Sequence, residues 1–332
     1  MRLNSDTEFA GGRISSDDRV GDLGQSFTMS TIAILGPGGV GGFLAAALAR
    51  AGEQVVVVAR EETAALIARD GLEVSSVRLG DFSARPDAES SLTDVVDVLL
   101  VATKATTLEP ALGRVNAAPR LVVPLLNGLD HLAVLRERFG PRAVAGSIRI
   151  EAYRTAPARV IQTSLFLRID VATENHRMRP AVAAFAETLD RAGIPTRVME
   201  SEAQAMWGKL VRLNALALMS SAYDLPLGPI RSTPELRDEL RACVEEGAAV
   251  ANADGARVEP AETMGELDDA HDTLGSSMQR DIAAGMEPEL DAIAGSVLRA
   301  AARHGLRCPT IERLAARVAE RSGVPVPAAA LG

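Results

Sequence analysis

Six residues near the beginning of the chain have the spacing GxGxxG: Gly36, Pro37, Gly38, Gly39, Val40 and Gly41. Glycines at these positions let the chain turn tightly and let its backbone approach a pyrophosphate, whose charge then faces the N-terminus of a helix. The motif alone is a weak signal, because glycines also serve in ordinary turns. Here it follows an apolar run at 31–35 and opens a helical segment that ends near Gly52. Strand, loop and helix together predict a dinucleotide-binding unit.

The next apolar run, QVVVVA at 54–59, is followed by Arg60, Glu61 and Glu62. An acid at the end of this strand would accept hydrogen bonds from the 2′-hydroxyl of NAD and would repel the 2′-phosphate of NADP. An arginine instead offers a planar set of donors that suits a phosphate. Arg60 ends the strand whereas the glutamates begin the next helix, so we predict NADP(H) as the cofactor. The alternative is that Arg60 is an exposed charge and that Glu61 or Glu62 contacts the ribose.

Two further polar residues follow apolar runs of the same kind. Lys104 comes after VVDVLLVAT at 95–103, and Asn127 comes after RLVVPLL at 120–126. Ligands of a doubly wound sheet bind at the carboxyl ends of its strands, so both side chains are candidates for a binding site. Asn-Gly is also a common turn pair, and that is the alternative interpretation of Asn127.

The elements that must position these residues alternate between short apolar strands and helical segments up to about residue 200. Continuous Val/Leu runs separated by helices are typical of a parallel sheet buried on both faces. An alternating pattern between 147 and 173 indicates antiparallel strands, and after residue 200 the pattern is almost entirely helical. We expect helices at roughly 202–224, 233–254, 259–272, 276–284 and 286–304, with another near the C-terminus.

The predicted fold class is therefore α/β, with an N-terminal Rossmann-type doubly wound domain followed by an all-helical C-terminal domain. We place the NADP-binding domain at 29–199 and the helical substrate or catalytic domain at 200–332. Residues 1–28 are rich in Ser, Gly and Asp and lack the apolar core of a signal peptide, so we expect a disordered extension there.

Composition narrows the class of partner. The net charge of −9 argues against a broad basic surface for nucleic acid, and the apolar stretches are too short to span a membrane. The two cysteines, Cys243 and Cys308, are best explained by a reducing cytoplasm, although one disulfide stays possible. Four scattered histidines and the absence of CxxC and HExxH patterns predict no metal site.

From about Thr31 to Ala315 the chain resembles the ketopantoate reductase (2-dehydropantoate 2-reductase) family. The resemblance depends on GPGGVG, on VATKATTLEPAL followed by PLLNGLDHLAVL, on MWGKL, and on SSMQRDIAAGMEPELDAIAGSVLRAA. It implies an active site between the two domains and NADPH-dependent reduction of a 2-keto acid, most typically ketopantoate to pantoate in pantothenate and coenzyme A biosynthesis. By analogy it also implies a homodimer.

The resemblance assigns a role to each matching residue of this chain. Lys209 in MWGKL matches the lysine that protonates the substrate oxygen, and Glu289 in PELD matches the acid beside the reacting groups. The other matches are a substrate-carboxylate ligand (Ser277), an asparagine near nicotinamide and substrate (Asn127), a cofactor contact (Lys104) and the 2′-phosphate arginine (Arg60).

These roles are chemically reasonable, since hydride addition to a ketone builds negative charge on oxygen and an ammonium stabilises it and donates a proton. Each residue also has an ordinary structural explanation. Lys209 could extend from an amphipathic helix to the surface, although its neighbours Trp207 and Leu210 are apolar. Glu289 could be a solvated helix residue, and Ser277 could cap a helix.

One departure from the family pattern concerns the substrate. The family places asparagines four and eight residues after the catalytic lysine, and here those positions are Leu213 and Ala217. Asn214, five residues on, is turned about 140° from Lys209 on an α-helix, and Arg212 could face the site instead. Loss of hydrogen-bond donors changes specificity strongly. The alternatives to ketopantoate reduction are therefore a paralogous 2-hydroxyacid dehydrogenase with another keto acid and a non-enzymatic NADPH-binding sensor.

Overall fold

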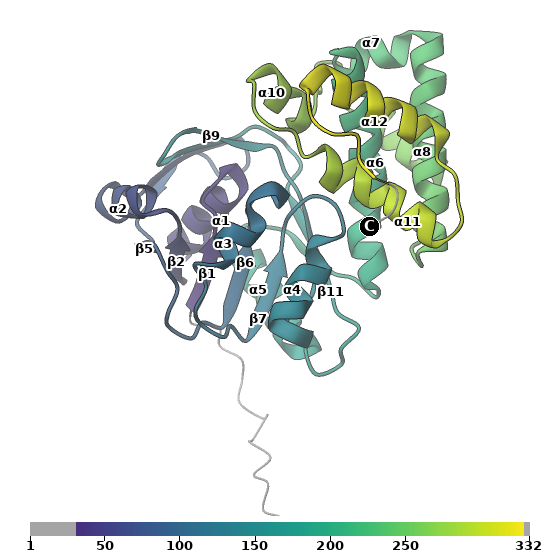
Figure 1. Cartoon of the computed structure of the whole chain (residues 1–332). Helices are drawn as coiled ribbons and strands as arrows, with labels where there is room; N and C mark the ends of the chain where they lie inside the picture. Colours follow the sequence, from purple (N-terminus) through teal and green to yellow (C-terminus); the bar gives the residue numbers. More distant parts are fainter. Residues whose placement is uncertain (1–30, 329–332) are drawn as a thin grey trace, which may run out of the picture.

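Five parallel strands form the main sheet, and all of them except the short polar strand at Asp87–Glu89 come from the apolar runs. A computed structural model describes residues 31–328, so the extension expected at 1–28 lies outside the described residues (Figure 1). The strand order is β5-β2-β1-β6-β7, and β1 pairs in parallel with β2 on one side and with β6 on the other. The strands are β1 (Thr31–Leu35), β2 (Gln54–Val58), β5 (Asp87–Glu89), β6 (Val98–Val101) and β7 (Leu121–Pro124).

Helices cover both faces of this sheet, and the side chains of β1 alternate between them. Ile32 and Ile34 pack in the cluster that includes α1 (Gly39–Arg50), while Ala33 and Leu35 pack in the cluster that includes α3 and α4. The remaining helices of this part are α2 (Glu61–Asp70), α3 (Leu108–Leu112), α4 (His131–Phe139) and α5 (Arg179–Arg191), with single 3-10 turns at Ala105–Thr107 and Gly140–Arg142.

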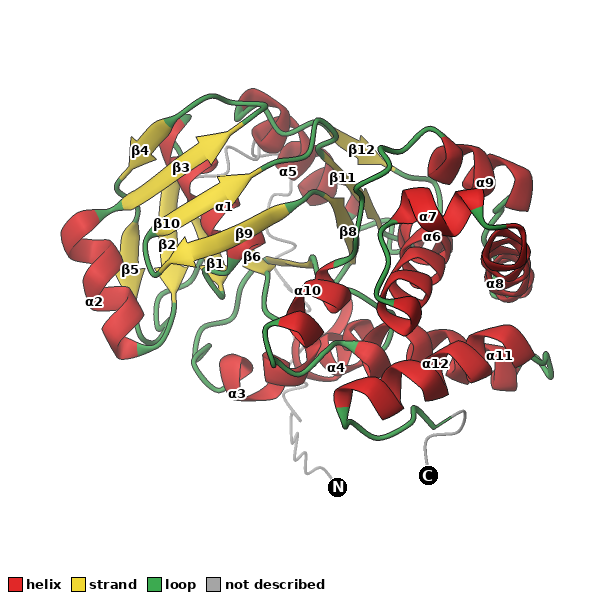
Figure 2. Cartoon of the chain, turned by 90° about the horizontal axis from the view of Figure 1, so that it is seen from above, coloured by secondary structure: helices red, strands yellow, loops and turns green. Residues whose placement is uncertain are grey.

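Two smaller sheets complete the N-terminal part. A four-stranded sheet, β4-β3-β10-β9, lies over α1 on the side away from the parallel sheet (Figure 2). A three-stranded sheet has the order β12-β11-β8. The alternation between 147 and 173 is confirmed as antiparallel pairing of β9 with β10 and of β8 with β11. The strands are β3 (Leu72–Ser76), β4 (Phe82–Ala84), β8 (Ala145–Arg149), β9 (Ala152–Ala156), β10 (Arg159–Gln162), β11 (Arg168–Ala172) and β12 (Thr196–Val198).

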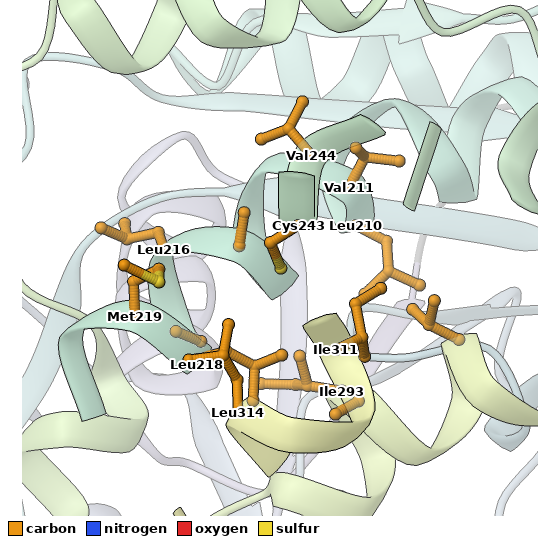
Figure 3. Packing of buried hydrophobic residues seen from close by; sticks show 14 of the residues in the cluster. Leu210, Val211, Leu216, Leu218, Met219, Cys243, Val244, Ile293, Ile311 and Leu314 are labelled. Carbon is orange, nitrogen blue, oxygen red and sulfur yellow. The ribbon is translucent and has the colours of Figure 1, made fainter. Parts of the chain in front are cut away.

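All described elements after Ser201 are helical, and three of them begin with a proline in the first turn, where its missing N–H costs no hydrogen bond. They pack around α6, whose buried face meets α8, α12 and the turn at Asp291–Gly295 in one apolar cluster (Figure 3). The helices are α6 (Glu202–Tyr223), α7 (Leu227–Ser232), α8 (Pro234–Ala253), α9 (Pro260–Asp268), α10 (Ser277–Ala283), α11 (Ser296–Arg303) and α12 (Pro309–Ser322). Within residues 31–328, none of the helices combines the length and the apolar character needed to cross a membrane.

The expected helix at 286–304 is wrong at its start. Pro288 interrupts the helical pattern, residues 286–289 are not helical, and the helix opens with a π-helical turn at Asp291–Gly295 before α11. The short helix α7 was not expected either, because Pro226 and Pro229 leave a helical pattern of only a few residues. The π-helical turn matters for the site, because it follows Glu289 directly.

Candidate active site

The glycine loop has the geometry that a dinucleotide requires. Gly36 has a φ of +92°, and a Cβ atom there would lie 2.7 Å from a Thr103 side-chain carbon. A Cβ on Gly41 would lie 2.1 Å from the carbonyl oxygen of Gly36, so only glycine lets α1 begin this close to the loop. Gly38 is the N-cap residue and provides no side-chain cap, and open space surrounds the position of its Cβ. The first turn of α1 therefore leaves backbone donors for an anion.

Arg60, Glu61 and Glu62 differ in their positions on α2 and in their partners. Arg60 is the exposed N-cap residue of α2, directly after the end of β2, and its guanidinium has no partner among residues 31–328. Glu61 is paired with Arg114, at 3.3 Å between Oε1 and Nη1. Glu62 is exposed at the second position of α2. Of the three candidates for the cofactor contact, Arg60 is thus the residue that both follows the strand directly and has a side chain free to bind a ligand.

Lys104 and Asn127 lie beyond the carboxyl ends of the neighbouring strands β6 and β7, and both reach across to the helical part. The Nζ atom of Lys104 is 2.9 Å from an oxygen of Asp281 on α10. Ser277, one turn before Asp281 on the same helix face, is exposed, and its hydroxyl makes no hydrogen bond within the described residues. Ser276, not Ser277, caps this helix, so the capping explanation of Ser277 is wrong.

A chain of three hydrogen bonds joins the other predicted residues. Lys209 on α6 donates from Nζ to Oδ1 of Asn127 over 2.8 Å, and Asn127 donates from Nδ2 to Oε2 of Glu289 over 3.0 Å. The other carboxylate oxygen of Glu289 accepts the backbone N–H of Ala105, at 2.9 Å. Residues 82 to 184 positions apart in the sequence therefore meet at one point, at the edge of the parallel sheet.

Close packing between the N-terminal part and the helical part holds these hydrogen-bonded residues in place. Gly128 has a φ of +84°, and a Cβ there would lie 1.9 Å from the carbonyl oxygen of Ala292 in the π-helical turn. Arg299, only 7% of whose side chain is exposed, donates to Asp130 and to Asp291. These two acids lie three residues after Asn127 and two residues after Glu289, so Arg299 fixes the segments that carry both.

The electrostatics of the site favour a lysine that releases its proton. The pKa of Lys209 is lowered from 10.5 to about 8; burial is the main cause, Glu289 opposes it, and the charges of Arg149 and Arg212 act in the same direction as burial. Both arginines are paired with Glu266, at 2.8 Å for Arg149 and 3.3 Å for Arg212. Burial lowers the pKa of Arg212 as well.

The positions that depart from the family pattern are apolar or turned away. Leu213 lines a small cavity next to Lys209, and Ala217 is completely buried in the helical core. Asn214 is also completely buried and its Nδ2 faces the sulfur of Cys243, so it does not replace the missing asparagines. Arg212 lies over the ring of Phe166 and pairs with Glu266.

Sequence reasoning missed several residues of this region: His131, Arg149, Asp281 and Arg299. It also missed a compositional signal for Lys104 and Lys209, which are the only two lysines of the chain beside 33 arginines. An arginine replaces lysine well as a surface charge but not as a proton donor near neutral pH, because its pKa is above about 12. The two ammonium groups of the chain both lie where the two parts meet.

Comparison with known proteins confirms the resemblance. The family model "Ketopantoate reductase PanE/ApbA" matches residues 32–173, and "Ketopantoate reductase PanE/ApbA C terminal" matches residues 203–327. The 2-dehydropantoate 2-reductase of Caulobacter vibrioides is 31% identical over 291 residues, which cover 85% of this chain and 95% of that protein.

Solved structures share the fold along nearly the whole described chain. The 2-dehydropantoate 2-reductase of Geobacter metallireducens has a TM-score of 0.80 at 26% identity, covering 87% of this chain and 99% of the other. A D-mandelate dehydrogenase, in a ternary structure with NADH and anilino(oxo)acetate, has a TM-score of 0.80 at 20% identity, covering 88% and 98%. The chain belongs to the ketopantoate reductase family and is an oxidoreductase that acts on a CH–OH group.

Proposed function

We propose that the protein reduces a 2-keto acid to a 2-hydroxy acid with NADPH. The observation that carries this proposal is the hydrogen-bond chain from Lys209 through Asn127 to Glu289, at the same sheet edge as the glycine loop. A binding protein would need the loop but not a buried ammonium whose pKa is close to neutral. These hydrogen-bonded residues therefore favour a catalytic function over that of a non-enzymatic sensor.

The cofactor site fits a nicotinamide dinucleotide phosphate. The first turn of α1 has no side-chain cap and has open space at Gly38, so it would hold the pyrophosphate, while the free guanidinium of Arg60 would hold the 2′-phosphate. Lys104 is a further candidate contact, once its ammonium leaves Asp281. When bound, NADPH supplies the hydride, and all the other steps belong to residues of this chain.

Lys209 is the proposed proton donor. An ammonium has three N–H groups, and one of them is used on Asn127, which leaves two for the oxygen of a bound keto acid. The amide of Asn127 sets the direction of the ammonium, since its own N–H group is held by Glu289. As hydride reaches the carbonyl carbon, the Nζ proton moves to the developing alkoxide and Lys209 is left as a neutral amine.

Ketopantoate is the leading substrate because the family is named for it, but the loss of polar side chains at Leu213 and Ala217 supports a second candidate. A pocket without those amides is suited to a more apolar keto acid, and a protein of this fold binds anilino(oxo)acetate. Ser277 is the proposed ligand of the substrate carboxylate, because it lies on the face of α10 whose Asp281 contacts Lys104.

The test is NADPH oxidation with a panel of 2-keto acids that includes ketopantoate and a phenyl-substituted keto acid. On the preferred substrate, Lys209→Ala should lose at least about a hundredfold in kcat with NADPH affinity kept. Lys209→Arg is the matched variant, because it keeps the positive charge but cannot release a proton near neutral pH. Full turnover in Lys209→Arg would reduce the role of Lys209 to charge alone, and no oxidation with any panel member would remove the proposed reaction.

A further inference from the structure

His131, in the first turn of α4, has no assigned role and an unusual environment. Its side chain is 5% exposed, and neither ring nitrogen makes a hydrogen bond of normal geometry within residues 31–328, although the backbone of Asn127 lies next to the ring. Leaving a buried polar group unpaired costs about 1–3 kcal/mol, so an explanation is needed. The pKa of His131 is lowered to about 4 by burial and by the positive charge of Lys209, while the backbone of Asn127 acts in the opposite direction. The ring is therefore neutral near pH 7, with a proton on one nitrogen and a lone pair on the other.

His131 lines a cavity that connects the site with solvent. The cavity has a volume of about 790 Å³, and its walls include Asn127 and Glu289 at one end. Glu109 and Glu287 also line it, and both are exposed, so the cavity is open to the surface. This volume is enough for a chain of water molecules, each of which occupies about 30 Å³ in the liquid.

The other charged groups around His131 do not serve as a proton donor to it. Asp130 lines the same cavity, but its carboxylate is held by Arg299. Glu289 is held by the side-chain amide of Asn127 and by the N–H of Ala105. Lys209 lies on the other side of Asn127, which lines both this cavity and the small cavity next to Lys209. Its charge acts on the ring of His131, and it is the group that gains and loses a proton in the proposed reaction.

The proposed reaction requires a group that returns a proton to Lys209, and this inference rests on the proposed function. Each turnover moves one proton from Lys209 to the hydroxyl of the product, so the neutral amine must regain a proton before the next turnover. Its ammonium lies between the two parts of the chain, bonded to Asn127. Direct contact with bulk water is limited there, because Lys209 is only partly exposed.

We propose that His131 is a proton-relay residue that returns the proton to Lys209 from water in this cavity. A proton carried by water binds the free ring nitrogen, while the N–H bond at the other nitrogen breaks and its proton passes to Nζ, directly or through water. One N–H bond forms on the ring as another breaks, and nothing is oxidised or reduced. Rotation of the ring, or the reverse exchange with water, restores the first tautomer.

The experiment separates the first turnover from the following ones. The enzyme loaded with NADPH, in excess over the preferred keto acid, reports hydride transfer with the proton already on Lys209. Excess keto acid and NADPH report steady turnover, which needs reprotonation. His131→Phe keeps the shape of the ring, His131→Gln keeps a polar group in case the first variant does not fold, and exposed His176→Gln is the matched control.

A relay predicts that His131→Phe lowers kcat at least about tenfold while the single-turnover rate stays within about twofold. Added imidazole should restore kcat in the variant and leave the wild type unchanged. An equal fall in both rates would show that His131 only shapes the site, and an unchanged kcat would show that the proton arrives by another path. Either result overturns the relay alone, whereas a wild type inactive on every keto acid overturns the proposed function as well.

Discussion

The pKa of Lys209 can be tested directly by exchanging Glu289 for Gln. The carboxylate of Glu289 stabilises the ammonium of Lys209, and the two are joined through the side-chain amide of Asn127. Two hydrogen bonds of 2.8 and 3.0 Å, with the amide between them, place the charges roughly 8 Å apart. At an effective dielectric constant of about 20 their attraction is about 2 kcal/mol, which corresponds to about 1.5 pH units.

The sign follows from the form of Lys209 that reacts. Only the ammonium donates a proton, so kcat/KM should be at its maximum below the pKa of Lys209. Above that pKa, kcat/KM should fall tenfold for each pH unit. In the wild type this decline should begin at about pH 8, because burial lowers the pKa to about that value. In Glu289→Gln the ammonium loses its carboxylate, so the decline should begin at roughly pH 6.5.

The assay uses the fact that the chain has two lysines. Protein labelled with ¹³C at the lysine ε-carbon should give two NMR signals, and Lys104→Arg assigns them by removing one. The chemical shift of the Lys209 signal against pH gives its pKa without any substrate, and kcat/KM against pH gives the same value from turnover. Glu287→Gln is the matched control, because Glu287 is exposed and precedes Glu289 by two residues.

The test depends on the pH at which kcat/KM begins to decline, and not on the maximal value of kcat/KM. Gln at 289 offers one acceptor oxygen to the two donors that Glu289 now serves, so the maximal rate should fall too. A Lys209 signal that titrates above pH 10 in the wild type would refute the effect of burial. A limb that stays at the wild-type pH in Glu289→Gln would refute the coupling through Asn127.

Three further predictions concern the cofactor, the contact between the two parts and the buried ion pairs. Arg60→Asp should shift the preference from NADPH toward NADH, measured as the ratio of the two kcat/KM values; an unaltered ratio would return the ribose contact to the neighbouring glutamates. Gly128→Ala should lower both Tm and kcat, since the added methyl meets backbone at 1.9 Å; Gly140→Ala, also at positive φ but in open space, should cost only about 1–2 kcal/mol in urea unfolding. Arg299→Ala should cost about 1–3 kcal/mol by the same measurement, because the hydrogen bonds of a buried guanidinium are lost while its two carboxylate partners stay in contact with water; exposed Arg303→Ala should cost less than about 1 kcal/mol.

Much of the fold could be predicted from the sequence because its signals are local. The run at Val98–Val101 is completely buried, as the absence of polar residues in it predicts. The boundaries were less accurate: the expected strand at 95–103 includes Val95, which is 65% exposed, and Lys104 lies beyond the end of the ladder. Strand ends depend on where a neighbouring strand stops, and one segment alone does not contain that information.

The arrangement of the site depends on contacts that local patterns do not contain. The π-helical turn after Glu289 requires room for Gly295 next to Asp291 and Arg299, because a Cβ on that glycine would lie 2.5 Å from the Asp291 carboxylate. The pair between Lys104 and Asp281 spans 177 positions. The roles of Lys209 and Glu289 came from family resemblance, and the hydrogen bonds between them required the folded chain. The scarcity of lysine was visible in the sequence from the start and would have marked both ammonium groups.

The geometry separates the chemistry of the site from its substrate preference. Lys209, the proposed proton donor, is oriented by Asn127 and Glu289, which lie on the loop after β7 and before the π-helical turn. The departures from the family pattern, Leu213 and Ala217, follow Lys209 on the same helix, α6, but take no part in that hydrogen-bond chain. Substitutions at these two positions should therefore change which keto acid is accepted while the ammonium keeps its direction and its pKa. If this separation holds, Leu213→Asn should change the order of preferred keto acids and leave the alkaline limb of the pH profile in place.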